Sequence, residues 1–150
     1  MGGRCLRIGP QVAAPPSVPA MQESALKPGT RVFVGHRSEL PDGTQRIVSV
    51  PGGEIGVIAH GGHLYAYRNR CAHQGGPVCE GMVIGRVMAA MTEDKKMLGE
   101  YFSESEPHLV CPWHGMEFLL ESGESAVDPR FRLHRHEVVE DPDGTVHVVI

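Results

Sequence analysis

The fold of this chain is decided by two short stretches: NRCAHQGGPVCE, residues 69–80, and VCPWHGMEF, residues 110–118. Each places a cysteine shortly before a histidine: Cys71 with His73, and Cys111 with His114; 37 residues separate His73 from Cys111. Thiolates and imidazoles together suit an iron–sulfur cluster, zinc or copper. A zinc finger usually takes its two cysteines from one element and its two histidines from another, whereas each stretch here offers one of each. Two irons bridged by sulfide explain this distribution, with both cysteines on one iron and both histidines on the other.

Length and composition exclude several classes of protein. The 150 residues suffice for one domain, and 41% apolar with 21% charged residues is typical of a globular chain. A net charge of −4 without a basic stripe disfavours nucleic-acid binding, because phosphate neutralisation dominates that affinity. No segment approaches the roughly 20 apolar residues that a membrane span requires.

From Pro28 onward the sequence predicts β-strands throughout. Short runs rich in Val, Ile and Tyr alternate with Gly- and Pro-containing turns, and Gly61-Gly62 predicts a two-residue hairpin loop with positive φ at both positions. The expected strands are residues 31–34, 46–50, 54–59, 63–67, 82–90, 96–102, 108–110, 116–120, 131–139 and 145–150. The pattern indicates an all-β, antiparallel barrel or sandwich, with no amphipathic helix longer than two turns. The core candidates near the C-terminus are Leu133, Val138, Val146 and Val148.

The two stretches, with their Gly and Pro neighbours, resemble those of the Rieske [2Fe–2S] proteins. The resemblance extends over roughly residues 28–150 and implies one [2Fe–2S] cluster per chain. By position, it places Cys71 and Cys111 on the inner iron, and His73 and His114 on the outer, solvent-near iron. Backbone N–H groups around Gly75, Gly76 and Gly115 are expected to approach the sulfides, because glycine lets the backbone come close. Trp113 is expected to shield the cluster between the two loops.

The resemblance also implies the architecture. A Rieske-type β-sandwich or barrel has three antiparallel layers, here a larger base closed by residues 131–139 and 145–150, and a small cluster-binding lobe at about residues 68–121. The 37-residue separation is longer than in compact Rieske ferredoxins, so residues 82–102 are interpreted as an inserted hairpin. The insertion is either a solvated decoration or a docking surface whose acidic end, with Glu100, Glu104 and Glu106, meets a basic redox partner.

Departures from the family pattern predict a low reduction potential. The Rieske proteins of cytochrome bc-type complexes carry a further, disulfide-bonded cysteine in each loop, and these positions hold Gly76 and Trp113 here. The hydroxyl donors of that group are replaced by Met116 and Phe118. Fewer hydrogen bonds to sulfur favour the oxidised state, so we expect a midpoint toward the lower end of about −150 to +300 mV.

The remaining candidates predict no second site. Cys79 is expected to be a small buried apolar residue, and Cys5 is poorly placed to pair with it, so a reducing compartment, the cytoplasm, fits best. His134 and His136 share one face of a strand but lack a third ligand. Glu117 is expected to alternate outward beside the inward Phe118.

The N-terminal segment, residues 1–27, is rich in Pro and Ala without any period and predicts a disordered tail before the domain at residues 28–150. An alternative is that translation starts at Met21.

Three functions remain open. The first is a one-electron carrier, resembling the ferredoxin component that passes electrons from a reductase to a terminal oxygenase or similar oxidoreductase. The second is the small Rieske-type subunit of a nitrite reductase or another oxidoreductase complex, and the third is a structural zinc module. No substrate-converting site is evident, so the sequence leaves open whether the protein is itself an enzyme, and it predicts no organic substrate, nucleic acid or membrane as partner.

Overall fold

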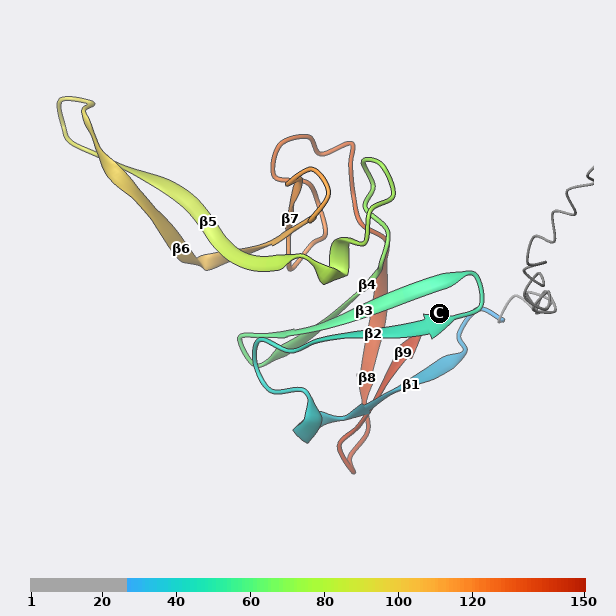
Figure 1. Ribbon diagram of the computed structural model, residues 1–150. Helices are drawn as coiled ribbons and strands as arrows, with labels where there is room; N and C mark the ends of the chain where they lie inside the picture. The colour runs from blue at the N-terminus through green and yellow to red at the C-terminus, as the bar shows by residue number, and fades with distance from the viewer. Residues whose placement is uncertain (1–26) are drawn as a thin grey trace, which may run out of the picture.

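The computed structural model describes residues 27–150, so the expected tail and the alternative start at Met21 lie outside the described residues. These residues form two antiparallel sheets, as the sequence predicts (Figure 1). The larger sheet, the base, has the order β1-β9-β8-β4-β3-β2. Its strands are β1 (Arg31–His36), β2 (Gln45–Val50), β3 (Gly53–His60), β4 (His63–Arg68), β8 (Arg135–Glu140) and β9 (Thr145–Val149).

The smaller sheet has the order β5-β6-β7. Its strands are β5 (Met82–Met91), β6 (Met97–Val110) and β7 (Glu117–Leu119), and the two short 3-10 turns of the described chain are η1 (Arg37–Glu39) and η2 (Val78–Glu80). No helix within residues 27–150 has the length and apolar character needed to cross a bilayer.

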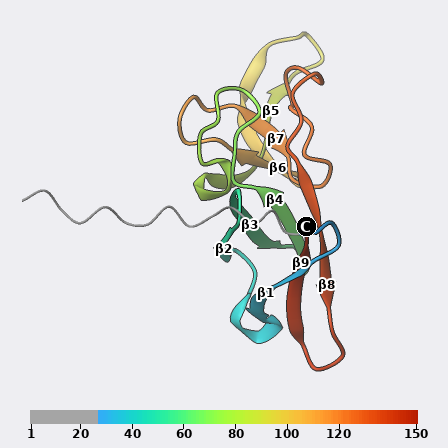
Figure 2. The ribbon, with the colours of Figure 1, turned by 90° about the vertical axis from the view of Figure 1, so that its right-hand side faces the viewer.

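The three expected layers are present, but two of them are continuous. β4 pairs with β8 through Ala66↔His136 and Tyr67↔Arg135, and this short ladder joins β1-β9-β8 to β2-β3-β4. The base is therefore one six-stranded sheet that curls toward a barrel, with the smaller sheet beside it (Figures 1 and 2). The chain leaves the base after β4 and returns to it at β8, so the residues between form a lobe, which also packs against β2 and β3 through Ile47 and Ile58.

Two cores fill the molecule on either side of β3 and β4. Ile55, Val57 and Ala59 of β3 pack into the base core, whereas Ile58 packs into the core of the lobe. This double burial explains why residues 55–59 form an uninterrupted apolar run. Of the core candidates, Leu133, Val146 and Val148 are buried, and Val138 packs half-buried against the base core.

The turn chemistry at Gly61-Gly62 is confirmed. The two residues have φ of 59° and 79° and connect β3 to β4, where His60 pairs with His63. Positive φ at both positions matches the right-handed twist of the flanking strands, which is why glycine is favoured there.

Two expected strand boundaries were wrong. Residues 96–102 and 108–110 belong to one strand, β6, which continues through Pro107 because the ladder shifts between Gly85↔Pro107 and Arg86↔Ser103. The three extra residues on β6 form a bulge directly beside Pro107, and bulges are among the few places in a sheet where proline is tolerated. The expected strand at residues 131–139 begins only at Arg135.

Candidate metal centre

The first cysteine–histidine loop, loop 1 (residues 71–77), follows β4 and is closed by its own backbone. The N–H of Cys71 donates to the carbonyl of Gly76 at 2.7 Å, and the N–H of Gly75 donates to the carbonyl of Cys71 at 2.9 Å. Gly75 has φ of 78°, a left-handed conformation that disfavours residues with a Cβ. These bonds turn the chain tightly and leave the side chain of His73 exposed at the end of the lobe.

The second loop, loop 2 (residues 111–117), connects β6 to β7 and repeats this backbone. The N–H of Cys111 donates to the carbonyl of Met116 at 2.9 Å, and the N–H of Gly115 donates to the carbonyl of Cys111 at 2.9 Å. Gly115 has φ of 68°. The cysteine and the left-handed glycine therefore occupy equivalent positions in both loops, whereas the histidine is two residues after the cysteine in loop 1 and three after it in loop 2.

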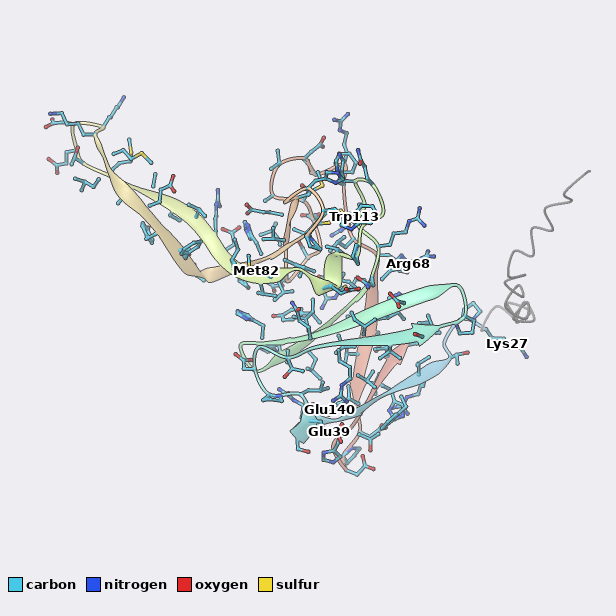
Figure 3. The ribbon with its side chains drawn as sticks, viewed as in Figure 1. Lys27, Glu39, Arg68, Met82, Trp113 and Glu140 are labelled. Atoms are coloured by element: carbon cyan, nitrogen blue, oxygen red, sulfur yellow. The ribbon has the colours of Figure 1, made fainter. Side chains whose placement is uncertain are left out.

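The hairpin β5–β6 brings the two loops together. Met82 at its start pairs with Val110 at its end, so the long separation in sequence closes at the base of the hairpin. A Cβ on Gly81 would collide with the Val110 carbonyl, so the approach there requires glycine. Figure 3 shows Trp113 of loop 2 in the loop region of the lobe and Met82 at the root of the hairpin.

The candidate ligands lie in two pairs of one chemical type each. The side chains of Cys71 and Cys111 are buried, at 3% and 1% exposure. His73 and His114 are exposed, and their ring centroids lie 5.2 Å apart at an interplanar angle of 87°. No group of three or more His, Cys, Asp or Glu side chains suited to one metal ion occurs in the described part of the chain.

Burial and hydrogen bonding act on the Cys71 thiol in opposite directions. Burial raises the pKa of Cys71, the neighbouring Cys111 thiol raises it as well, and the backbone N–H groups of His73 and Gln74 lower it by hydrogen bonding to the sulfur. Thiols lose their protons when they bind metal, and N–H groups directed at sulfur stabilise the resulting negative charge. Two inner sulfur and two outer nitrogen donors fit a two-iron, two-sulfide group.

Aromatic rings flank the imidazole pair. The ring of Trp113 meets His114 edge to face at 6.3 Å, and Phe131 meets His73 in the same way at 6.0 Å. Trp113 packs against Gly76 of loop 1, where a Cβ would come within 2.8 Å of two ring atoms. The indole thus lies between the loops as expected, but it is 59% exposed, so it covers the site only in part.

Three contacts around the loops were not foreseen. His108 on β6 is 2% exposed and its Nδ1 lies 2.8 Å from Glu117 Oε2, whereas its Nε2 has no hydrogen-bond partner among the described residues. Tyr67 donates from its buried hydroxyl to the Leu120 carbonyl at 2.7 Å. Asn69 accepts the Cys79 N–H at 2.9 Å.

Two expectations for this region are confirmed. Glu117 lies on the face opposite the buried Phe118, where its carboxylate also contacts His108. Strand alternation predicts the face of a residue but not what covers that face. Cys79 is fully buried, as predicted, and burial raises its pKa to about 12.

The remaining histidine pair lies elsewhere. The rings of His134 and His136 are 4.8 Å apart, and His136 is hydrogen-bonded through Nδ1 to the Val149 carbonyl at 3.2 Å. Burial lowers the pKa of His136.

Three similarities to known proteins agree with this geometry. A human Rieske domain-containing protein is 26% identical over 103 residues, which are 69% of this chain and 55% of the relative, so this chain spans about half the length of that relative. The solved complex of reduced oxygenase and oxidized ferredoxin in carbazole 1,9a-dioxygenase contains a chain with 24% identity and a TM-score of 0.58, covering 79% of this chain and 92% of that one. A putative NADH-dependent nitrite reductase small subunit from Mycobacterium tuberculosis has 16% identity and a TM-score of 0.62, covering 81% and 96%.

The model of the Rieske [2Fe–2S] domain matches residues 30–137, which include both loops and most of the base. A family defined by a [2Fe–2S] cluster explains the donor set, the paired loops and the antiparallel fold together. This chain belongs to the Rieske [2Fe–2S] domain family.

Proposed function

We propose that the protein is a one-electron carrier in which Cys71 and Cys111 hold the inner iron and His73 and His114 hold the outer iron. The observation that carries the proposal is the separation of the candidate ligands by type, with two buried thiols and two exposed imidazoles whose ring centroids lie 5.2 Å apart. One iron with two thiolates and one with two imidazoles is the ligand distribution of a Rieske centre.

The residues around the cluster would then have different roles. A bound [2Fe–2S] cluster accepts and releases one electron. The buried cysteines keep water from the sulfur side, and the N–H groups of His73 and Gln74 stabilise negative charge on Cys71. The imidazoles of His73 and His114 lie at the surface, where another redox protein can come close.

The surroundings of loop 2 support a low potential. Met116 and Phe118 stand where the high-potential group has hydroxyl donors, and Phe118 is fully buried in the core of the lobe. With fewer hydrogen bonds to sulfur, we expect a midpoint toward the lower end of about −150 to +300 mV. A redox titration measures it, and a midpoint near the upper end contradicts this part of the proposal.

The electron donor and acceptor are inferred from similar proteins. One similar structure is described as a ferredoxin in complex with the oxygenase of carbazole 1,9a-dioxygenase. We propose that this protein likewise takes an electron from a reductase and passes it to an oxygenase or a similar oxidoreductase. The similarity to a putative nitrite reductase small subunit keeps a second candidate, a subunit of such a complex. With Cys71 and Cys111 assigned to the cluster, Cys79 is the remaining cysteine of the described residues and forms no disulfide, and we propose the reducing cytoplasm as the location.

The test of the carrier proposal is the chromophore of the purified protein and its loss in ligand variants. We expect two irons and two acid-labile sulfides per chain, a red-brown colour and, after reduction, an EPR signal with an average g below the free-electron value. Cys71→Ser and Cys111→Ser should remove the cluster, and His73→Ala and His114→Ala should remove it or change its spectrum.

The matched controls are His134→Ala and His136→Ala, which alter the other close imidazole pair. These variants should keep the native spectrum. Stoichiometric zinc without labile sulfide would instead support the structural zinc module, and an unchanged chromophore in either His73→Ala or His114→Ala would reject the ligand assignment.

A further inference from the structure

The outer part of the β5–β6 hairpin, the distal hairpin (residues 86–103), projects away from the rest of the molecule (Figures 1 and 3). Its register pairs Val87 with Phe102, Ala89 with Glu100, and Met91 with Met97. Alternate strand positions point to the same side, so these three pairs share one face. We call it the apolar face, because Glu100 is its single charged residue and its large exposed apolar side chains, four in number, exceed those of the opposite face, Met88 and Tyr101.

The apolar face is exposed to an unusual degree. Val87, Met91, Met97 and Phe102 are 43%, 54%, 58% and 64% exposed. At roughly 150–200 Å² for a whole large apolar side chain, these fractions amount to about 400 Å². That area reaches the range of the largest apolar patches on monomeric proteins, which are often interaction sites. A two-stranded hairpin without packing is also only marginally stable in water, so this face is suited to being covered.

The turn at the end of the distal hairpin carries both signs of charge. Its sequence is Glu93-Asp94-Lys95-Lys96, and the turn is closed by the Thr92 N–H to the Lys96 carbonyl at 2.9 Å. Counting Arg86 and Glu100, the distal hairpin has three basic and three acidic residues. At its root, Glu106 is paired with Arg86 at 2.9 Å. The segment therefore carries both signs of charge and can pair with a second copy of itself, while Glu104 and Glu106 of the acidic end considered from the sequence follow it on β6.

We propose that the apolar face is a self-association surface, covered by the same face of a second copy of this chain. In a twofold interface each contact occurs twice, with residue i on one copy meeting residue j on the other and the reverse. When two apolar faces pack against each other, both are removed from water. The turn of each copy carries both signs of charge, so its acidic residues can pair with the lysines of the other copy.

Glu100 determines how we expect the two copies to be oriented in the dimer. A carboxylate inside an apolar contact costs free energy unless a cation accompanies it. The copy offers the lysines of its turn, Lys95 and Lys96, so each Glu100 faces the partner's lysine turn. The proposed ligand loops, which follow β4 and β6, lie apart from the projecting end of the hairpin, so they stay open to redox partners in the dimer (Figure 1).

The first test is the oligomeric state of the cluster-loaded protein by sedimentation velocity from about 1 to about 500 μM. The apolar area is about half of what each side of a standard interface buries, so we expect a weak, concentration-dependent dimer. Phe102→Ser combined with Met91→Ser should raise the dissociation constant at least tenfold. A protein that stays monomeric across the whole range overturns the proposal.

The sharper test exchanges charges across the twofold axis. Glu100→Lys alone places lysine against lysine, and Lys95→Glu with Lys96→Glu alone places glutamate against glutamate, so each variant should be monomeric. In an equimolar mixture of the two variants, the introduced lysine of one chain meets the introduced glutamates of the other, and the native Glu100 meets native lysines. The mixture should therefore dimerise again. The control is Glu137→Lys, an exposed site on β8 that should leave dimerisation unchanged.

Restored dimerisation in the mixture is not expected from a general change in solubility or charge. Dimers in either single variant, or a mixture that remains monomeric, overturn the assignment of Glu100 to the partner's turn. An unchanged visible spectrum in every variant shows that the fold and the cluster site are intact, so a failure here is distinct from a failure of the carrier proposal.

Discussion

Loop 1 and loop 2 have the same backbone and different side chains. Both are closed by a cysteine N–H that bonds five residues ahead and by a glycine N–H that bonds back to the cysteine carbonyl. At the sixth position, however, loop 1 has Gly76 and loop 2 has Met116, and the third residue of loop 2 is Trp113, whose ring packs on Gly76. The two loops are therefore complementary rather than identical, because Gly76 of loop 1 leaves space for the indole of Trp113 from loop 2.

The supports of the two loops differ as well. Loop 1 is preceded by Asn69, which accepts the Cys79 N–H, and loop 2 is flanked by the His108–Glu117 contact between β6 and β7. Tyr67 links the two sides, because it lies before loop 1 and donates to a carbonyl after loop 2. The comparison teaches that a repeated backbone form sets the positions of the proposed ligands, while unlike side chains fix the loops to each other.

The largest effect is expected where the loops interlock. Gly76→Ala puts a methyl group within contact distance of the Trp113 ring, and overpacking of this kind costs about 1–3 kcal/mol. The free energy of unfolding of the loaded protein, measured with denaturant, should fall by this amount. In a Trp113→Ala background the same substitution should cost clearly less, because the ring contacts are gone and only the Cβ of residue 113, at 3.2 Å, remains close. Equal costs in both backgrounds would contradict the contact between the loops.

A smaller effect, equal in the two loops, is expected at the left-handed glycines. Gly75→Ala and Gly115→Ala should each lower the stability by about 1–2 kcal/mol, because an L-residue with a Cβ is strained at positive φ. No atom outside the neighbouring residues lies closer than 3.5 Å to a Cβ at either position, so backbone strain is the main cost. Asparagine tolerates this conformation, so Gly75→Asn and Gly115→Asn should cost less. A large difference between the stability losses at Gly75 and Gly115 would show that the two loop backbones are not equivalent.

The smallest effect is expected at the link between the loops. Tyr67→Phe removes the hydrogen bond to the Leu120 carbonyl and should cost about 1 kcal/mol. Tyr65→Phe is the matched control on the same strand, and it should cost less, since Tyr65 is only half-buried. Thermal unfolding of both variants measures the difference.

Tyr67 also predicts a dependence of stability on pH. Burial raises the pKa of its phenol from 10.0 to about 12, as it raises that of the Cys79 thiol from 9.0 to about 12. Both groups ionise more easily in the unfolded chain, so their contribution is complete below pH 9 and is lost as the pH rises toward 12. Tyr67→Phe should remove the part of this decrease that begins near pH 10. A decrease that is identical in native protein and variant would show that the phenol does not contribute.

Much of the fold follows from local sequence, and the exceptions have physical causes. Turn residues bounded most strands correctly, and Gly61-Gly62 was assigned because only glycine adopts positive φ freely at two adjacent positions. The continuation of β6 through Pro107 was missed because a bulge, which depends on both strands, absorbs the proline. Sequence patterns of one strand carry no information on its partner's register.

For the site, the sequence offered the ligand types but not their supports. The equivalence of the two loops rests on backbone hydrogen bonds, which are hard to recognise from side chains that differ at five of the seven positions. The contact of His108 with Glu117 joins residues on two paired strands, and alternation alone gave no sign that this face is covered. Trp113 was placed between the loops, but its large exposure depends on the shape of the surface around it.

The return of the chain to the base has a consequence for the order of folding. Arg31 pairs with Val149, and Ala66 pairs with His136. Both ladders that close the base therefore form only after β8 and β9, the last two strands of the chain, have been synthesised. Contacts between residues so distant along the chain form slowly, whereas the β5–β6 hairpin joins neighbouring segments and can form before them. We expect the hairpin of a newly synthesised chain to bring Cys71 and Cys111 near each other before β8 and β9 complete the base sheet. Binding of metal to the proposed ligands can then begin before the base has folded.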